Sequence, residues 1–203
     1  VAIPSIIMQS IISIMTVGMN KILANDTAIS VFGVYYKLHS FIFMPIFGLT
    51  GALIPIVAYN FGARQHDRIV KATRLALIIA LSIMALGTVL FELFPKFFLE
   101  IFNADSGLIT MGVPALRIIC TGFCFSGFSI VFSSCFQALG RAYLSMIVSI
   151  SRQLVVILPL AFILKITFGL GYVWYSMVTA EVVGALMCFF MYRSVKKNVL
   201  DKI

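Results

Sequence analysis

The chain has 203 residues, of which 62% are hydrophobic and only 11% are charged, whereas a soluble domain averages about 45–50% apolar and about 25% charged residues. Its mean hydropathy of +1.10 excludes a water-soluble fold, because a domain of this size cannot hide so much apolar surface from water. The net charge of +8 comes without a compact basic segment, so we expect a lipid bilayer as partner and no nucleic acid.

Six apolar runs are long enough to cross a bilayer, which takes about 20 helical residues. The backbone cannot leave its polar groups unpaired in lipid, so each run is predicted to be a helix. The sequence therefore predicts an all-α integral membrane protein whose single domain, residues 1–203, contains six transmembrane helices. The predicted spans are about 3–24, 28–60, 69–95, 108–139, 143–165 and 168–192.

The loop charges predict how these helices are oriented. Basic residues are concentrated after the second, fourth and sixth runs, and all three segments fall on one side of the membrane. Cytoplasmic loops are enriched in Lys and Arg, so we expect a multi-pass plasma-membrane protein with both ends of this chain in the cytoplasm. The residues concerned are Arg64, Arg68, Lys71, Arg74, Arg141, Arg193, Lys196, Lys197 and Lys202.

The first run carries a polar stripe at the spacing of one helix face. It consists of Ser5, Gln9, Ser13, Thr16 and Asn20. Polar groups facing lipid are costly, so this face points to other helices or to a water-filled cavity. Two interpretations stay open, namely hydrogen bonding between helices and the lining of a solute path.

The second run is longer than one perpendicular crossing needs, and Pro45 and Pro55 are its predicted bend points. Lys37 either reaches outward to the interface or points into a cavity. For His39 a packing or interfacial role is favoured over proton carriage.

The later runs contain the charges that lie deepest in the apolar sequence. Arg117 lies in the fourth run, Arg152 with Gln153 in the fifth, and Glu181 in the sixth. Such charges need a partner or water. We therefore interpret Glu181 either as the ion-pair partner of Arg152 or Arg117, or as a group that binds a proton or cation.

The fourth run also has a row of small and polar residues at helical spacing, for which we predict tight helix packing. The row consists of Gly122, Ser126, Ser129, Ser133 and Gln137. The four cysteines lie in apolar runs without His or acidic residues at ligand spacing, so no metal site is expected. No catalytic motif is present either, and the sequence predicts neither an enzyme nor a bound cofactor.

Several motifs, in this order, resemble the second half of the multidrug and toxic compound extrusion (MATE) family, in its bacterial drug-efflux branch. They are Pro4 with Gln9, Tyr36–Leu38, Phe43–Leu49, Tyr59–Arg64, Phe136–Arg141, Ser151–Gln153 with Pro159, and Gly171–Trp174 with Glu181. The resemblance covers essentially the whole chain. It implies a transporter of twelve helices in two six-helix lobes, of which this chain is the C-terminal lobe and a fragment of a longer protein.

The resemblance further implies that the complete protein exports organic cations or other amphipathic drugs by alternating access, in exchange for Na⁺ or H⁺. Some family members carry coupling acids at positions that correspond here to Ile12 and Phe128, and neither side chain can bind a cation. We therefore expect the coupling site outside this chain, in the N-terminal lobe that is its expected partner. On these grounds the cavity-lining candidates are Gln9, Thr16, Asn20, Tyr36, Lys37 and Met44.

Two alternatives to a drug exporter stay open. A flippase of the same superfamily, which moves lipid-linked oligosaccharides, would need a cationic cleft for phosphate, and Lys37, Arg117 and Arg152 are compatible with it. The other alternative is a membrane scaffold without transport activity, or a half-transporter that pairs with itself.

Overall fold

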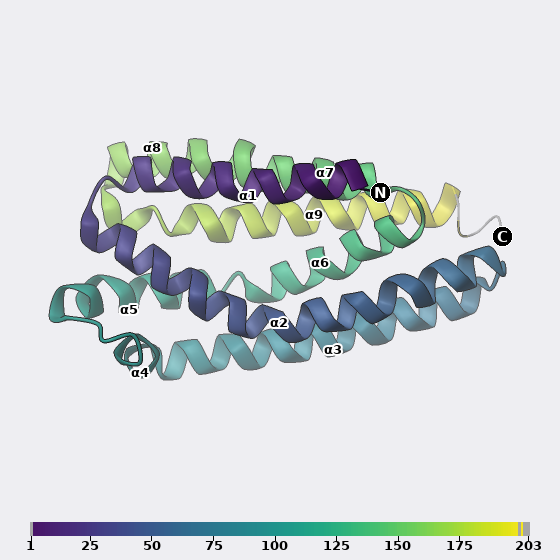
Figure 1. Ribbon diagram of the computed structural model, residues 1–203, viewed down its shortest axis with the longest axis horizontal. Helices are drawn as coiled ribbons and strands as arrows, with labels where there is room; N and C mark the ends of the chain where they lie inside the picture. The colour runs from purple at the N-terminus through teal and green to yellow at the C-terminus, as the bar shows by residue number, and fades with distance from the viewer. Residues whose placement is uncertain (1, 199, 201–203) are drawn as a thin grey trace.

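The computed structural model describes residues 2–198 and 200, without the side chains of residues 2–5 and 9, and is a bundle of long helices with no strand in the described part (Figure 1). The all-α prediction is thereby confirmed. The elements are α1 (Ala2–Leu23), α2 (Asp26–Gly62), α3 (His66–Leu93), α4 (Pro95–Glu100), α5 (Ser106–Cys120), α6 (Phe123–Ala138), α7 (Ala142–Ile150), the π-helix η1 (Ser151–Ile157), α8 (Leu158–Phe168), the 3₁₀ turn η2 (Leu170–Tyr172) and α9 (Tyr175–Asn198).

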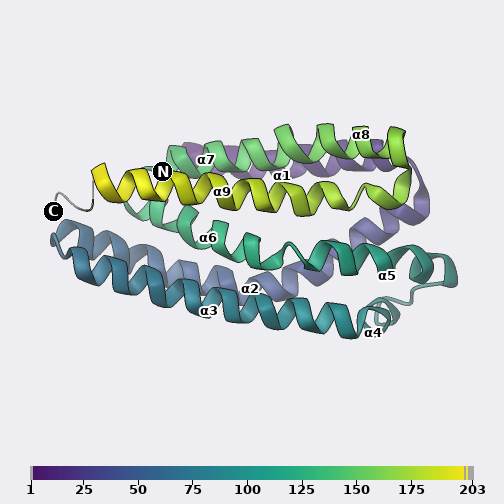
Figure 2. The same cartoon turned by 180° about the vertical axis from the view of Figure 1, so that it is seen from behind.

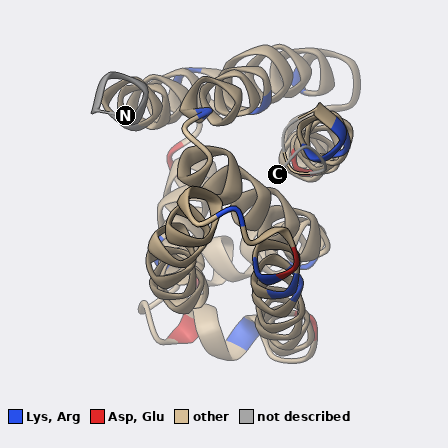
Figure 3. Ribbon diagram, turned by 90° about the vertical axis from the view of Figure 1, so that its right-hand side faces the viewer, with Lys and Arg blue, Asp and Glu red and all other residues tan. Residues whose placement is uncertain are grey.

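The helices form two layers with α6 between them. In Figures 1 and 2, α1, α7, α8 and α9 lie on one side of the bundle, and α2 and α3 lie on the other. The α2–α3 and α6–α7 turns lie at the same end as the start of α1 and the end of α9. Figure 3 looks onto this end, where the basic segments predicted to be cytoplasmic are gathered.

Five helical segments are long and apolar enough to cross a membrane, or six when the bent pair α5 and α6 counts as one span. The five are Ile6–Leu23, Asp26–Gly62, His66–Leu93, Ala142–Phe168 and Leu170–Asn198. The predicted span 108–139 corresponds to this bent pair and is not one straight helix. Its two halves, α5 and α6, meet at an angle of 49°.

The break between α5 and α6 is held by hydrogen bonds from hydroxyl groups. A broken helix leaves carbonyl groups without their usual donors. The Thr88 hydroxyl of α3 is shared between the Met84 carbonyl of its own helix, at 2.9 Å, and the Cys120 carbonyl, at 3.0 Å. The Thr121 hydroxyl donates to the Ile118 carbonyl over 2.7 Å. These bonds keep the bend from exposing unpaired backbone groups inside the bundle.

In contrast to α5–α6, α2 continues as one helix of 37 residues through both Pro45 and Pro55. Its first turn is capped by the Asn25 side chain, which accepts a hydrogen bond from the Ala28 N–H over 3.0 Å. The helix changes direction along its length in Figure 1 and does not split. The main break of the bundle thus lies in the fourth predicted span and not in the second.

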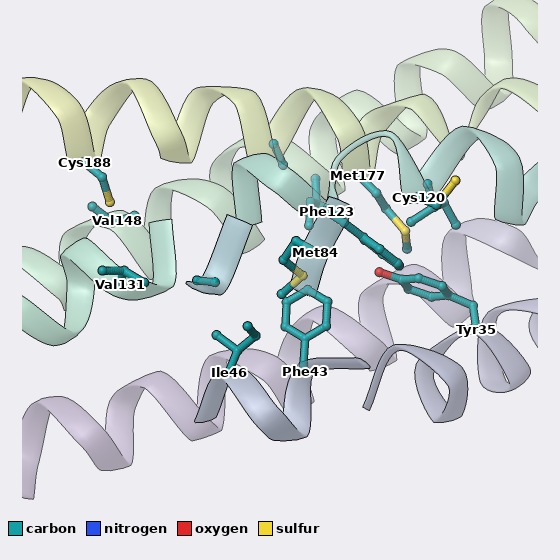
Figure 4. Packing of buried hydrophobic residues seen from close by; sticks show 14 of the residues in the cluster. Tyr35, Phe43, Ile46, Met84, Cys120, Phe123, Val131, Val148, Met177 and Cys188 are labelled. Carbon is teal, nitrogen blue, oxygen red and sulfur yellow. The ribbon is translucent and has the colours of Figure 1, made fainter. Parts of the chain in front are cut away.

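The apolar core lies where α2, α3 and α6 meet. Figure 4 shows Phe43 and Ile46 pointing from α2 toward Met84 of α3 and Phe123 of α6, and all four side chains are buried. A Cβ atom built at Gly87 of α3 would lie 2.9 Å from a methyl group of Ile42. Glycine is therefore what allows α2 and α3 to approach this closely.

The α1 helix is tied to α8 at the opposite end of the bundle from the termini. The Lys165 ammonium group of α8 donates hydrogen bonds to the carbonyl oxygens of Ile22 and Leu23, over 2.5 and 3.2 Å. A positive charge at a helix C-terminus offsets the partial negative charge there. This contact holds α1 against the α7–α8 layer, away from α2.

Candidate functional site

A cavity of about 390 Å³ lies between the two layers. Its walls come from α1, α2, α6, α9 and the segment that runs from α7 into η1. The lining residues are Met8, Ile12, Met15, Tyr35, Tyr36, His39, Phe43, Phe47, Thr50, Ile54, Ser129, Ile130, Ser133, Ser134, Gln137, Val148, Ser149, Arg152, Gln153, Ile157, Met177 and Glu181.

One wall of the cavity is an aromatic face of α2. Tyr36, His39, Phe43 and Phe47 follow one another at steps of three or four residues, which brings them onto one side of the helix. The His39 ring stacks on the Phe43 ring, with centroids 3.6 Å apart. His39 thus combines the predicted packing role with a place in the cavity wall. Together these rings give the cavity an aromatic wall, in which Tyr36 and Phe47 are tilted against the stacked His39 and Phe43 rings.

At the other side of the cavity lies an ion pair. Arg152 Nη1 donates to Glu181 Oε2 over 2.8 Å, and each side chain is only 19% exposed. Of the two arginines considered as partners of Glu181, Arg152 is the one that pairs with it. Arg117, in contrast, is exposed on α5.

Two glycines leave room for this ion pair. A Cβ atom built at Gly184 of α9 would lie 3.1 Å from the Cδ atom of Arg152, and one built at Gly122 would lie 3.5 Å from the Cγ atom of Glu181. Both aliphatic stems therefore run close against neighbouring backbone. An added methyl group at Gly184 would press on the Arg152 side chain, whereas the distance at Gly122 is an ordinary van der Waals contact.

The π-helix η1 carries Arg152 and Gln153. It ends just before Pro159, which lacks a backbone N–H for the carbonyl four residues earlier, and a widened turn accommodates this loss. Gln153 is 7% exposed, and its Oε1 atom is buried without a hydrogen-bond partner. A buried acceptor without a partner is costly, so this position favours a donor from a molecule in the cavity.

The residues of the polar row on the fourth span, for which tight packing was predicted, lie in two different environments. Ser126 is buried and returns its hydroxyl to the Gly122 carbonyl over 3.3 Å. Ser129, Ser133 and Gln137 line the cavity instead. Polar residues at this spacing are compatible with both roles, and the neighbouring helices decide between them.

Of the six cavity candidates, Tyr36 lines the described cavity. The side chain of Gln9 lies outside the described residues. Thr16 is half-buried and donates to the Ile12 carbonyl over 2.9 Å, and Asn20 has a buried Oδ1 atom without a partner. Neither Thr16 nor Asn20 is among the lining residues.

Lys37 and Met44 also lie outside the described cavity. The Lys37 side chain is exposed, and its Nζ atom lies 5.6 Å from the centre of the Phe102 ring, next to α4. Met44 is 67% exposed. Both follow cavity residues in the α2 sequence but lie on other faces of the helix, which explains why sequence position alone did not separate them from Tyr36 and His39.

Gln153, Ser133 and His39 also line the cavity, although they were not among the predicted cavity residues. A stricter use of helical spacing could have found His39, which follows Tyr36 by three positions. No comparable signal marked Gln153, because its orientation depends on the π-helical turn. In the described part of the chain, no group of three or more His, Cys, Asp and Glu side chains could hold a metal ion.

Comparison with known proteins places these features in a family. The family model MatE matches residues 2–163. The multidrug export protein MepA of Staphylococcus haemolyticus is 25% identical over 205 residues, which cover 100% of this chain and 45% of MepA. MepA of Staphylococcus aureus strain bovine RF122 / ET3-1 is 28% identical over 193 residues, with coverages of 92% and 41%. The chain thus spans less than half the length of these relatives.

Solved transporter structures share the fold. An outward-facing MATE family multidrug resistance transporter superposes with a TM-score of 0.92 at 24% identity, over 98% of this chain and 46% of that one. An inward-facing structure superposes with a TM-score of 0.84 at 25% identity, over 97% and 47%. Because the family model covers most of the sequence, the chain belongs to the MatE family.

Proposed function

We propose that this chain forms the C-terminal lobe of a multidrug exporter and that the complete protein moves several amphipathic drugs across the plasma membrane by alternating access. The observation that carries the proposal is the cavity between α1 and α2, with its aromatic wall and its hydroxyl and amide groups. Small-molecule sites combine a mostly apolar lining with a few placed polar groups. Met8, Met15 and Met177 add adaptable side chains, which suit the binding of varied molecules.

The proposed partner is an N-terminal lobe of six helices. The supporting observation is that relatives such as MepA are more than twice as long as the matched region. Midplane binding sites between two structural repeats are common in secondary transporters. The end of the bundle that carries Arg64, Arg68 and Arg141 is proposed to face the cytoplasm, by the positive-inside rule.

Coupling to Na⁺ or H⁺ antiport is part of the same proposal, with the coupling site in the N-terminal lobe. In this chain, Ile12 lines the cavity at one of the positions where some family members carry an acid. The Glu181 carboxylate already has Arg152 as its partner. Neither group is therefore available as a simple coupling acid.

An exporter is preferred over an oligosaccharide flippase because the cavity has no uncompensated cation among its lining residues. Of the three basic residues that kept the flippase alternative open, Lys37 and Arg117 lie outside the cavity, and Arg152 is paired. A phosphate group would find no free positive charge there.

Efflux by cells that lack their own drug exporters tests the proposal. We expect the complete transporter to lower the accumulation of several unrelated dyes, and Tyr36→Ala to reduce efflux of some of them several-fold. Phe189→Ala is the matched control, because Phe189 is exposed on α9 and does not line the cavity. Unchanged accumulation of every dye with the wild-type transporter would contradict the proposed function.

A further inference from the structure

The cavity contains equal numbers of positive and negative side chains. Its lining includes one carboxylate, Glu181, and one guanidinium group, Arg152, and the two are in direct contact at 2.8 Å. Lys37, the one lysine of α2, lies outside the cavity with its Nζ atom 5.6 Å from the centre of the Phe102 ring. Protonation of His39, the lining histidine, would add positive charge. The cavity therefore has no net negative charge to attract a cation.

The pair is also built into the wall in a way that resists separation. Gly184 leaves room for the aliphatic stem of Arg152 against α9, and the two charged side chains are only 19% exposed. Water screens such a partly buried pair less than a surface pair. A cationic ligand could bind the Glu181 carboxylate only by displacing the Arg152 guanidinium group or by binding beside that positive charge.

Besides the ion pair, the cavity wall contains an uncharged hydrogen-bond acceptor without a partner. Gln153 Oε1 is a neutral acceptor, buried and without a partner, and Gln153 is more than nine-tenths buried. It needs an N–H or O–H donor, which an uncharged molecule can supply. The rings of Tyr36, His39 and Phe47 match a flat aromatic body.

We propose that Arg152 determines the charge specificity of this cavity, so that the cavity takes uncharged aromatic molecules with a hydrogen-bond donor in preference to permanent cations. This proposal rests on the proposed function and makes it narrower. The family resemblance implies organic cations for the complete transporter, which has a second lobe with groups of its own. In the cavity of this lobe, the guanidinium group cancels the attraction of Glu181 for such cations.

The experiment uses two probes that differ in one charge. Aminostyrylpyridine is uncharged at mildly alkaline pH, and its N-methylpyridinium derivative is a permanent cation with the same aromatic frame and the same amine donor. The readout is local to the cavity. It is the concentration of each probe that halves the labelling rate of Ser149→Cys by a small thiol reagent, in the full-length transporter with its native cysteines replaced.

In the otherwise wild-type protein, the uncharged probe is expected to protect at about a tenfold lower concentration than the cation, because the cation loses hydration on entering the cavity and the neutral ion pair does not replace it. Arg152→Gln should remove the difference or reverse it, by about tenfold in favour of the cation. The double variant Arg152→Gln with Glu181→Gln restores charge balance and should restore the preference for the uncharged probe. Lys37→Gln removes the same charge outside the cavity and should change nothing.

Glu181→Gln is a second test that does not depend on the folding of Arg152→Gln. It leaves the guanidinium group without its counter-charge and should weaken protection by the cation further. Equal protection by the two probes, or a preference that Arg152→Gln and Glu181→Gln do not alter, would overturn the proposal. Absence of protection by either probe would overturn it as well. Dye efflux, measured in parallel with the same proteins, reports separately on whether the complete protein is an exporter.

Discussion

The two sides of α2 contrast sharply in what they contact. On one side, Ile46, Leu53 and Val57 are fully buried in the apolar core shared with α3 and α6. On the adjoining face, Tyr36 and Phe47 line the cavity toward α1, and His39 and Phe43 line it at the border with the core. One helix can thus provide both a packing surface and a binding surface. This requires that α3 and α6 pack closely against α2 while α1 lies farther from it.

The first prediction tests the packed side at its centre. Phe123→Ala should lower the stability of the full-length protein by about 3 kcal/mol, because it leaves a cavity where a large buried ring was removed. The Phe123 ring meets those of Phe43 and Phe91, each at 5.7 Å between centroids. Thermal denaturation in detergent measures the loss. Phe189→Ala, on an exposed ring, should cost much less, and equal losses would contradict the description of this core.

The second prediction tests the cavity side. Arg152→Gln should destabilise the protein by about 2 kcal/mol, somewhat less than for a fully buried pair, because the cavity admits some water to the Glu181 carboxylate left behind. The double variant with Glu181→Gln should lose less than the sum of the two single variants. Thermal denaturation of the four proteins measures this coupling, and strictly additive losses would mean that the two groups do not interact.

A third prediction compares two glycines in the α2–α3 pair. Gly87→Ala should cost about 1 kcal/mol, because the added methyl group would meet the stiff Ile42 side chain at 2.9 Å. Gly33→Ala, where a Cβ atom would have nothing within 4 Å, should instead stabilise α2 by about 0.5–1 kcal/mol through helix propensity. The shift in unfolding midpoint checks both signs, and the same sign at both positions would contradict the packing described.

The fourth prediction concerns the break between α5 and α6 and expects a loss as small as that at Gly87. Thr88→Val should cost about 1 kcal/mol, since the Cys120 carbonyl loses its donor from α3. Thr110→Val is the matched control, because the Thr110 hydroxyl is exposed and bonds only within its own helix in the described structure. If the two variants unfold at the same temperature, the hydroxyl of Thr88 does not support the break.

The sequence was sufficient to predict the helices and a membrane protein, because a bilayer requires helical segments of about 20 apolar residues and such segments are visible in a sequence. It was not sufficient to predict where the bundle breaks. Pro45 and Pro55 have strong local signals, yet α2 stays one helix, while the break at Thr121 and Gly122 depends on a hydroxyl from α3. A hydrogen bond between two helices cannot be predicted from the residues next to the break alone.

For the candidate site, the chemical types were more predictable than the positions. The pairing of Glu181 with an arginine follows from the cost of an isolated charge in this setting, and the sequence narrowed the partner to two residues. The orientation of Gln153 could not be predicted, since it depends on a π-helical turn. The same holds for Lys37, which is directed to Phe102 in the turn after α4.

We propose above all that a drug carried by the complete transporter binds in the cavity between α1 and α2. A structure of the full-length transporter with a bound drug, determined in a lipid environment, tests it most directly. If the drug binds there, we expect its density against the Tyr36 ring and within hydrogen-bonding distance of Gln153 Oε1. A drug bound only in the other lobe, with the side chains of this cavity free of ligand, would contradict it.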